Sequence, residues 1–300
     1  MTLADHVSAA TGRLRLAGLS HDEAAQSAVV LGRFALGWTA ADWLSRSRDN
    51  ALPEFIARFD PLIDRRADHE PVAYITGERE FYGRPFRVTR DVLIPRPETE
   101  LVVDEALAAI GSGRSGRTPP PLQILDVGTG SGCLAVTLAL ECPAATVVAT
   151  DVSRAALDVA RENAGRLGAA DRIEFRFVDG STPPSGPSEL ADARFDLVVT
   201  NPPYVPETDR GSLPRNVIDF EPEIALFAGA DGLSVIREIL PMAARVLVPG
   251  GHLVLEIGHG QLSEVQDLIQ GTAGLTFHHF RPDLQGLSRV VVAAATRASF

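Results

Sequence analysis

The amino-acid sequence predicts an α/β fold in which a small helical bundle precedes a doubly wound, mostly parallel sheet. Residues 1–70 place apolar side chains at helical spacing. From residue 122 onward, short apolar runs typical of buried strands alternate with helical segments, and a Gly-rich loop joins the first run to a helix. The 300 residues, 45% of them hydrophobic, are enough to bury a large core.

The first 75 residues are expected to form a separate helical domain. Ser20 and Glu23 have the spacing of a capping box, and Gly18 and Gly37 lie where helices would stop. The predicted helices span Leu3–Leu16, Ser20–Leu36, Thr39–Trp43 and Pro53–Arg66.

Residues 76–95 are expected to form a hairpin-like linker, because Gly77 and Gly83 interrupt short extended runs. A catalytic domain over residues 96–300 would follow. Its first helix is predicted over Glu98–Ile110, and the Gly- and Pro-rich stretch 111–121 is predicted to be a flexible loop.

Seven strands are predicted in the second domain. The last two leave no room for a helix between them and must therefore be antiparallel. The predicted strands span residues 122–127, 145–150, 172–178, 195–200, 251–257, 275–280 and 288–295.

Two features predict an adenosine-containing cofactor. After the first strand, Gly128, Gly130 and Gly132 allow positive φ and a close approach of a ligand to the backbone, beside a helix N-terminus. Asp151 ends the second strand, where a carboxylate can bind both ribose hydroxyls. The glycines alone are a weak signal, and the pair does not identify the cofactor.

Asn201-Pro202-Pro203-Tyr204 follows the fourth strand. Two consecutive prolines make the strand exit rigid and non-helical. An amide, free carbonyls and an aromatic ring on such a loop suit recognition of a planar group that bears an NH₂. A nicotinamide dehydrogenase would explain the glycines and Asp151 but gives this tetrapeptide no task. A non-catalytic binding factor is a further alternative, which intact motifs on three strands disfavour.

Together these motifs resemble those of S-adenosylmethionine-dependent methyltransferases that act on exocyclic or amide nitrogens. Three further segments are similar to the protein-(glutamine-N5) methyltransferases, which modify the Gly-Gly-Gln loop of peptide chain release factors. The resemblance covers about residue 70 to the C-terminus. Its segments are Glu80–Val88, Leu93–Glu100, which reads Leu-Ile-Pro-Arg-Pro-Glu-Thr-Glu, and Phe220–Phe227.

The resemblance implies a seven-stranded, Rossmann-like methyltransferase domain, S-adenosyl-L-methionine as cofactor and release factors as partners. No metal site is expected, because no His/Cys cluster has metal-ligand spacing. The helical domain would recognise the protein substrate. The implied cofactor-binding residues are Asp126, Gly128, Thr129, Gly130, Ser131, Gly132, Asp151, Gly180 and Asn201.

The tetrapeptide would bind the target glutamine and carry the catalytic groups, which are Asn201, Pro202 and Tyr204. Asn201 Oδ1 and the Pro202 carbonyl would accept the two N–H bonds of the target amide. Tyr204 would pack on the amide plane or simply form a wall, and Pro203 would keep the loop rigid. The same tetrapeptide would suit adenine N6, cytosine N4 or guanine N2, so a nucleic-acid amino methyltransferase is the alternative.

Charge and cysteine content bear on partners and location. The net charge is −11, every one of the 28 basic residues is arginine, and no basic stripe suits phosphate binding, so direct nucleic-acid binding is not expected. Cys133 and Cys142 would face opposite sides of one helix, which disfavours a disulfide. With no signal peptide and no apolar run of about 18 residues, we expect a cytoplasmic protein without a membrane span.

Overall fold

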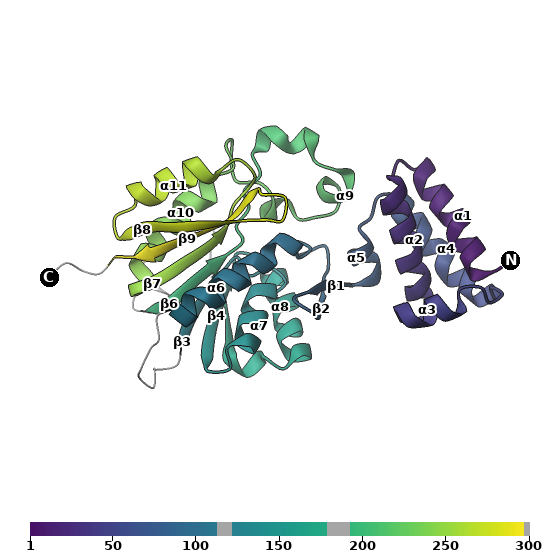
Figure 1. Cartoon of the computed structure of the whole chain (residues 1–300), viewed down its shortest axis with the longest axis horizontal. Coiled ribbons are helices and arrows are strands. Elements are labelled where there is room, and N and C mark those ends of the chain that lie inside the picture. The colour runs from purple at the N-terminus through teal and green to yellow at the C-terminus, as the bar shows by residue number, and fades with distance from the viewer. Residues whose placement is uncertain (113–121, 179–192, 297–300) are drawn as a thin grey trace. The chain divides into compact units, whose positions relative to one another are not determined.

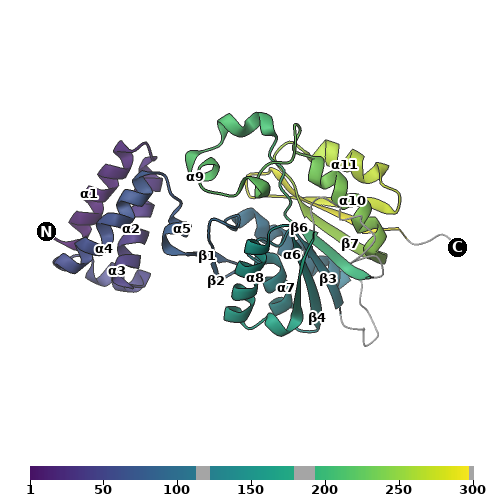
Figure 2. The ribbon, with the colours of Figure 1, turned by 180° about the vertical axis from the view of Figure 1, so that it is seen from behind.

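The computed structural model describes residues 1–112, 122–178 and 193–296. The chain forms two compact units, one of residues 1–78 with 214–220 and the other of residues 79–213 with 221–300 (Figures 1 and 2). Gly180 and most of the predicted loop 111–121 lie outside the described residues.

The first unit is a helical bundle in which α2 packs against both α1 and α4 (Figure 1). Apolar side chains at helical spacing, among them Leu14, Leu31, Phe59 and Ile63, are fully buried at its centre. The predicted helices are confirmed to within a few residues. The helices are α1 (Leu3–Leu16), α2 (His21–Leu36), α3 (Ala40–Arg46), α4 (Pro53–Ala67), α5 (Val72–Thr76) and α9 (Arg215–Ile218).

The start of α2 differs in one respect from the sequence prediction. Ser20 caps the helix, accepting the N–H of Glu23 at 3.3 Å, but the return bond of a capping box is not formed. The Glu23 carboxylate instead pairs with Arg66 of α4. A buried guanidinium needs a charge partner, and this need outweighs a local bond to one backbone N–H.

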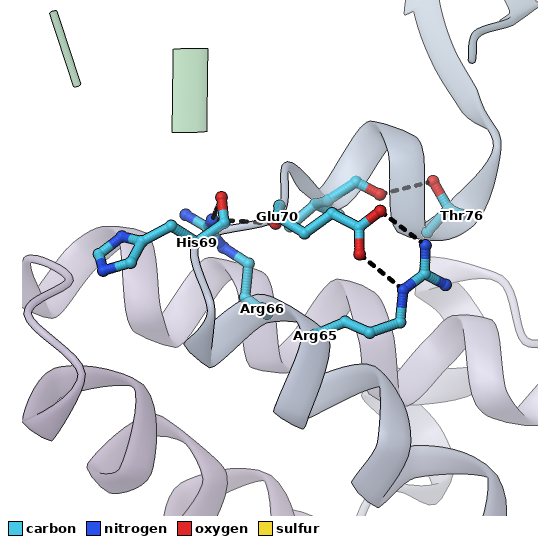
Figure 3. Close-up of polar contacts among 6 residues, drawn as sticks. Arg65, Arg66, His69, Glu70 and Thr76 are labelled. Carbon is cyan, nitrogen blue, oxygen red and sulfur yellow. Dashed lines mark hydrogen bonds and ion pairs between the residues drawn. The ribbon is translucent and has the colours of Figure 1, made fainter. Parts of the chain in front are cut away.

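Two arginines fix the turn from α4 into α5 (Figure 3). Arg65 donates two hydrogen bonds to the Glu70 carboxylate, at 2.7 and 2.8 Å. Arg66, with 3% of its surface exposed, donates to the backbone carbonyls of His69 and Glu70 at 3.1 and 3.0 Å. Arg66 Nε also donates to Ser27 Oγ of α2 at 3.2 Å, so Arg66 connects this turn to α2.

The predicted hairpin is formed by β1 (Glu78–Phe81) and β2 (Arg84–Arg87). Tyr82 and Gly83 connect the strands with φ of 51° and 72°, the sign that a type I′ hairpin turn requires at both positions. Glu100 Oε1 accepts the Tyr82 N–H at 2.8 Å, which holds the non-glycine residue in this left-handed conformation.

The second unit is built on a seven-stranded sheet, as predicted, and the strand order is β5-β4-β3-β6-β7-β9-β8. Neighbouring strands from β5 to β7 are parallel, and β9 runs antiparallel to both β7 and β8. The strands are β3 (Leu122–Val127), β4 (Ala145–Asp151), β5 (Ile173–Phe177), β6 (Phe195–Thr200), β7 (Leu247–Glu256), β8 (Leu275–Pro282) and β9 (Ser288–Ala295).

Helices cover both faces of this sheet (Figures 1 and 2). Because side chains alternate along a strand, Ile124 packs with α6 and α7 on one face, while Leu125 packs with α10 and α11 on the other. The helices are α6 (Glu100–Ser112), α7 (Cys133–Glu141), α8 (Arg154–Leu167), α10 (Ser234–Val246) and α11 (Leu262–Gly271), with short 3₁₀ turns η1 (Pro97–Thr99), η2 (Ala170–Arg172), η3 (Glu207–Ser212) and η4 (Glu223–Ala225).

The strand order brings the predicted motifs together. β3 lies between β4 and β6, and Val127 is in register with Thr150 on one side and Thr200 on the other. The Gly-rich loop, Asp151 and Asn201 therefore leave three adjacent parallel strands at the same edge. This is the edge where doubly wound sheets bind their ligands.

Candidate active site

The Gly-rich loop turns back over the end of β4. The N–H groups of Gly128 and Thr129 both donate to the Thr150 carbonyl at 2.9 Å. Gly130 and Gly132 have φ of 54° and 81°, in the left-handed region. A Cβ on Gly130 would meet nothing within 4 Å, so this position is open toward a ligand.

Asp126 lies beneath the loop and is fully buried. Its Oδ2 accepts the Thr129 hydroxyl at 2.7 Å and the Ala135 N–H at 3.1 Å, so it joins the loop to the first turn of α7. Burial raises the pKa of Asp126 to about 7. Its Oδ1 has no hydrogen-bond partner among the described residues. A direct contact between Asp126 and the cofactor stays a prediction.

Asp151 occupies the end of β4, as the sequence indicates. One carboxylate oxygen accepts the Gly130 N–H at 2.8 Å, and the other accepts the Ser153 N–H at 2.9 Å. Burial raises its pKa, against the effect of these N–H bonds. The residue therefore shapes the loop as well as lining the cavity beside it.

Asn163 of α8 is a structural part of the site that the sequence analysis missed. Its side chain is fully buried, and Nδ2 donates to the carbonyls of Ser131 and Arg87 at 2.8 and 2.9 Å. Its Oδ1 accepts the Arg87 N–H at 2.7 Å. The Asn163 amide thus connects the Gly-rich loop to β2. Because Asn163 and Arg87 are 76 residues apart, no local sequence pattern predicts this contact.

The residues of the tetrapeptide that follows β6 line two different cavities. Asn201, Pro202 and Pro203 line the cavity beside the Gly-rich loop. Asn201 Nδ2 donates to Thr99 Oγ1 at 2.9 Å, while Oδ1 is buried with no partner among the described residues. Tyr204 lines a neighbouring hollow of about 820 Å³, together with Arg289. Its packing against a target amide stays a prediction.

Thr99 and Glu256 connect the two halves of the tetrapeptide. Glu256, at the end of β7, is 1% exposed and accepts the Thr99 hydroxyl at 2.6 Å and the Tyr204 hydroxyl at 3.1 Å. Burial raises the pKa of Glu256 to about 7. Burial also raises the pKa of Tyr204, and the Glu256 carboxylate raises it further. From the sequence, Glu256 was recognisable only as a strand end.

An ion pair joins two of the segments that carry the family resemblance. Arg96 donates to Glu221 at 2.6 Å, and the second oxygen of Glu221 accepts the Ile94 N–H at 3.3 Å. The Glu221 carboxylate is fully buried, so this pairing is needed to keep it charged. The pair fixes Pro95 and Pro222 on the wall of the cavity.

The cavity has a volume of about 470 Å³. Its lining includes the Gly-rich loop and Asp151 as well as apolar residues such as Val152, Val178 and Ile224. An open glycine loop, a carboxylate at the end of the second parallel strand and apolar lining residues fit an adenosine cofactor with an amino-acid arm. Thr129 and Ser131 also line this cavity, whereas Gly132 packs against α8.

Three further findings concern the part of the chain that the structure describes. None of its helices is long and apolar enough to cross a membrane. Its histidine, cysteine and acidic side chains form no group of three or more that could hold a metal ion. Cys133 and Cys142 do not form a disulfide, and burial raises the pKa of the Cys133 thiol to about 12.

Comparisons with known proteins agree with this geometry. Residues 7–77 match the family model of the PrmC N-terminal domain, and residues 117–219 match that of the Methyltransferase small domain. Among solved structures, the hMettl16 catalytic domain in complex with MAT2A 3′UTR hairpin 1 is 16% identical, with a TM-score of 0.56 over 79% of this chain and 82% of that chain. A methyltransferase from Pyrococcus furiosus is 15% identical, with a TM-score of 0.51 over 78% and 99%. These two likenesses show the fold.

Sequence relatives are much closer. A release factor glutamine methyltransferase of Cereibacter sphaeroides is 43% identical over 98% of both chains. One from Neisseria gonorrhoeae is 41% identical over 88% of this chain and 90% of its own. This identity over nearly the full length confirms the resemblance and the expected enzyme class. The chain belongs to the release factor glutamine methyltransferase family.

Proposed function

We propose that this protein transfers the methyl group of S-adenosyl-L-methionine to the side-chain nitrogen, N5, of the glutamine in the Gly-Gly-Gln loop of peptide chain release factors. The single observation that supports this most is the unpartnered Oδ1 of Asn201 beside the cofactor cavity. A buried acceptor without a partner suits a ligand that brings an N–H donor.

The cofactor would supply a methyl group made electrophilic by its sulfonium. Asp151 would hold the ribose hydroxyls, and the loop from Gly128 to Ser131 would lie against the amino-acid arm. Val152, Val178 and Ile224, which are among the apolar residues that line the cavity, would contact the adenine. Gly180 is proposed near the adenine by the family resemblance alone.

The tetrapeptide would orient the target rather than deprotonate it. An amide nitrogen is a weak nucleophile because its lone pair is delocalised into the carbonyl. Acceptance of both N–H bonds, by Asn201 Oδ1 and the Pro202 carbonyl, would fix the nitrogen in position and stabilise positive charge as it develops. The proton can leave after the methyl group has been transferred. Pro203 would keep this geometry rigid.

The second candidate is a nucleic-acid amino methyltransferase, since a base NH₂ would fit the same acceptors. The net charge of −11 opposes it, because nucleic-acid binding depends on phosphate neutralisation. We therefore propose a protein substrate, no direct nucleic-acid binding and a cytoplasmic location. The helices of residues 1–75 are proposed to contact the release factor.

Methyl transfer from labelled cofactor tests this function. A purified release factor should become labelled, while its Gly-Gly-Gln glutamine-to-alanine variant, DNA and RNA should not. Label on the alanine variant would place the modification elsewhere. Label on naked nucleic acid would favour the base methyltransferase.

A further inference from the structure

A buried chain of hydrogen bonds runs from the tetrapeptide into the protein. Asn201 Nδ2 donates to Thr99 Oγ1 at 2.9 Å, and the Thr99 hydroxyl donates to Glu256 Oε2 at 2.6 Å. Tyr204 donates to the other oxygen of Glu256 at 3.1 Å. Thr99 and Glu256 are each 1% exposed, so water does not compete for these groups.

The donors and acceptors of these groups allow the chain of hydrogen bonds to run in only one direction. An ionised carboxylate can only accept, so the single hydroxyl proton of Thr99 points to Glu256. The Thr99 oxygen then has only lone pairs to offer Asn201, and it must face the NH₂ end of the amide. A flipped amide would set its oxygen against the Thr99 oxygen with no proton between them, in a buried site.

We propose that Glu256 and Thr99 are positioning residues that set the Asn201 amide with its oxygen toward the target, so that the site selects a target that donates N–H. The proposal rests on the proposed function and adds the origin of its selectivity. Glutamine, which brings an NH₂ group, is bound, whereas a glutamate carboxylate of nearly the same shape meets an acceptor and is rejected. Neither positioning residue needs to touch the reacting atoms.

Thr99→Val is the sharpest test, because it keeps the shape of the side chain and removes the hydroxyl. Without this hydroxyl, Thr99 no longer favours one orientation of the Asn201 amide over the flipped one. We expect the single-turnover rate on a release factor to fall about 10- to 100-fold. We also expect the parent's preference for a release factor over its Gly-Gly-Gln glutamine-to-glutamate variant, measured as a ratio of dissociation constants, to fall toward one. Thr99→Ser should restore both.

Thr137→Val is the matched control. It removes a buried hydroxyl from α7 that has no partner among the described residues, so rate and preference should stay at the parent values. An effect of Thr137→Val equal to that of Thr99→Val would mean that any buried hydroxyl loss is harmful, and would overturn the proposal.

A readout independent of activity is the ¹⁵N-labelled side-chain amide of Asn201, identified in the NMR spectrum by its absence in Asn201→Ala. One of its protons should be shifted by the bond to Thr99 in the parent and in Thr99→Ser, and should lose that shift in Thr99→Val. Unchanged signals, rate and preference in Thr99→Val would overturn the proposal. Failure of the parent to label a release factor would instead reject the proposed function, while the NMR comparison would still decide the orientation of Asn201.

Discussion

Asp151 Oδ2 accepts the backbone N–H of Gly130 at 2.8 Å, so the residue that we propose to bind the ribose also holds the Gly-rich loop. Its other oxygen accepts the Ser153 N–H at the start of α8. One carboxylate therefore determines the shape of two neighbouring parts of the cavity. Substitutions at Asp151 must be interpreted with both roles in mind.

Asp151→Ala is expected to weaken S-adenosylmethionine binding by about 1.5–3 kcal/mol, since hydrogen bonds to a charged group are lost. Asp151→Asn keeps one acceptor but turns an NH₂ group toward a backbone N–H, so it too should lose affinity. Calorimetry on the folded variants measures the change. An affinity of Asp151→Ala within twofold of the parent would rule out the ribose contact.

Gly132→Ala and Gly130→Ala should separate packing from binding. A Cβ on Gly132 would lie 3.1 Å from Ala160 Cβ and 3.2 Å from its Cα, whereas a Cβ on Gly130 has open space. Both positions have positive φ, which disfavours alanine by about 1–2 kcal/mol. We expect Gly132→Ala to lower the free energy of unfolding more than Gly130→Ala, as measured with urea. Equal losses in the free energy of unfolding would mean that α8 shifts to accommodate the added Cβ at no measurable cost.

Asn201→Ala should leave cofactor affinity nearly unchanged and slow methyl transfer by about 10²-fold or more, because an orienting bond at the reacting nitrogen is lost. Asn201→Asp should also be strongly defective. Its carboxylate would compete with Glu256 for the one hydroxyl proton of Thr99, and like charges in a buried site repel. Single-turnover rates at saturating cofactor decide the matter. Parent-like rates in both variants would exclude the target clamp.

The pH dependence of the methyl-transfer rate should reflect the titration of Glu256, because burial raises the pKa of this residue from 4.5 to about 7. Below about pH 7 the protonated carboxyl can itself donate to Thr99, so the transfer rate at saturating cofactor should fall. Glu256→Gln should lack this inflection. The charged groups that act on Glu256 are Glu98, which raises its pKa, and Arg289, which lowers it.

The same titration affects stability. The folded state holds the Glu256 proton between about pH 4.5 and 7, where the unfolded state has lost it. The free energy of unfolding should therefore fall as pH rises through this range, by up to about 1.4 kcal/mol per pH unit. Urea titrations of Glu256→Gln should show a shallower fall. An unchanged slope would assign the effect to another group, such as Asp126.

The N-terminal helices are predicted to contact the release factor. The units divide after Glu78, and the Arg65–Glu70 pair belongs to the helical unit, so a shortened chain should begin at Arg79 rather than near Glu70. If it folds, this chain should bind S-adenosylhomocysteine like the parent yet lose most activity on an intact release factor. Undiminished turnover would indicate that the helices only cover the catalytic unit.

Local patterns predicted the strands and the motifs at their ends. A run such as Phe195–Thr200 is apolar on both faces, as a central parallel strand requires, and a rigid loop directly follows it. The parallel arrangement of these strands followed from the fold class. Asn201 and Asp151 could therefore be placed at one edge of the sheet from the sequence alone.

Such local patterns could not predict hydrogen bonds between residues that are far apart in the sequence. Thr99 and Asn201 are 102 residues apart, and Asn163 binds a strand 76 residues away. A buried threonine or asparagine has the same local signature whether its partner is a neighbour or a catalytic group. Glu256 was equally ambiguous, since burial alone decides whether a strand-end carboxylate is solvated or holds a proton near neutral pH.

The position of β9 has a consequence for how the protein is made. This strand is synthesised after β8, yet it lies between β7 and β8 in the finished sheet. During vectorial synthesis the outer edge of β7 therefore stays unpaired until residues 288–295 emerge and insert. An open edge of this kind invites association with other nascent chains. Glu256, which is paired in register with Val290, acquires its final surroundings only at that late step.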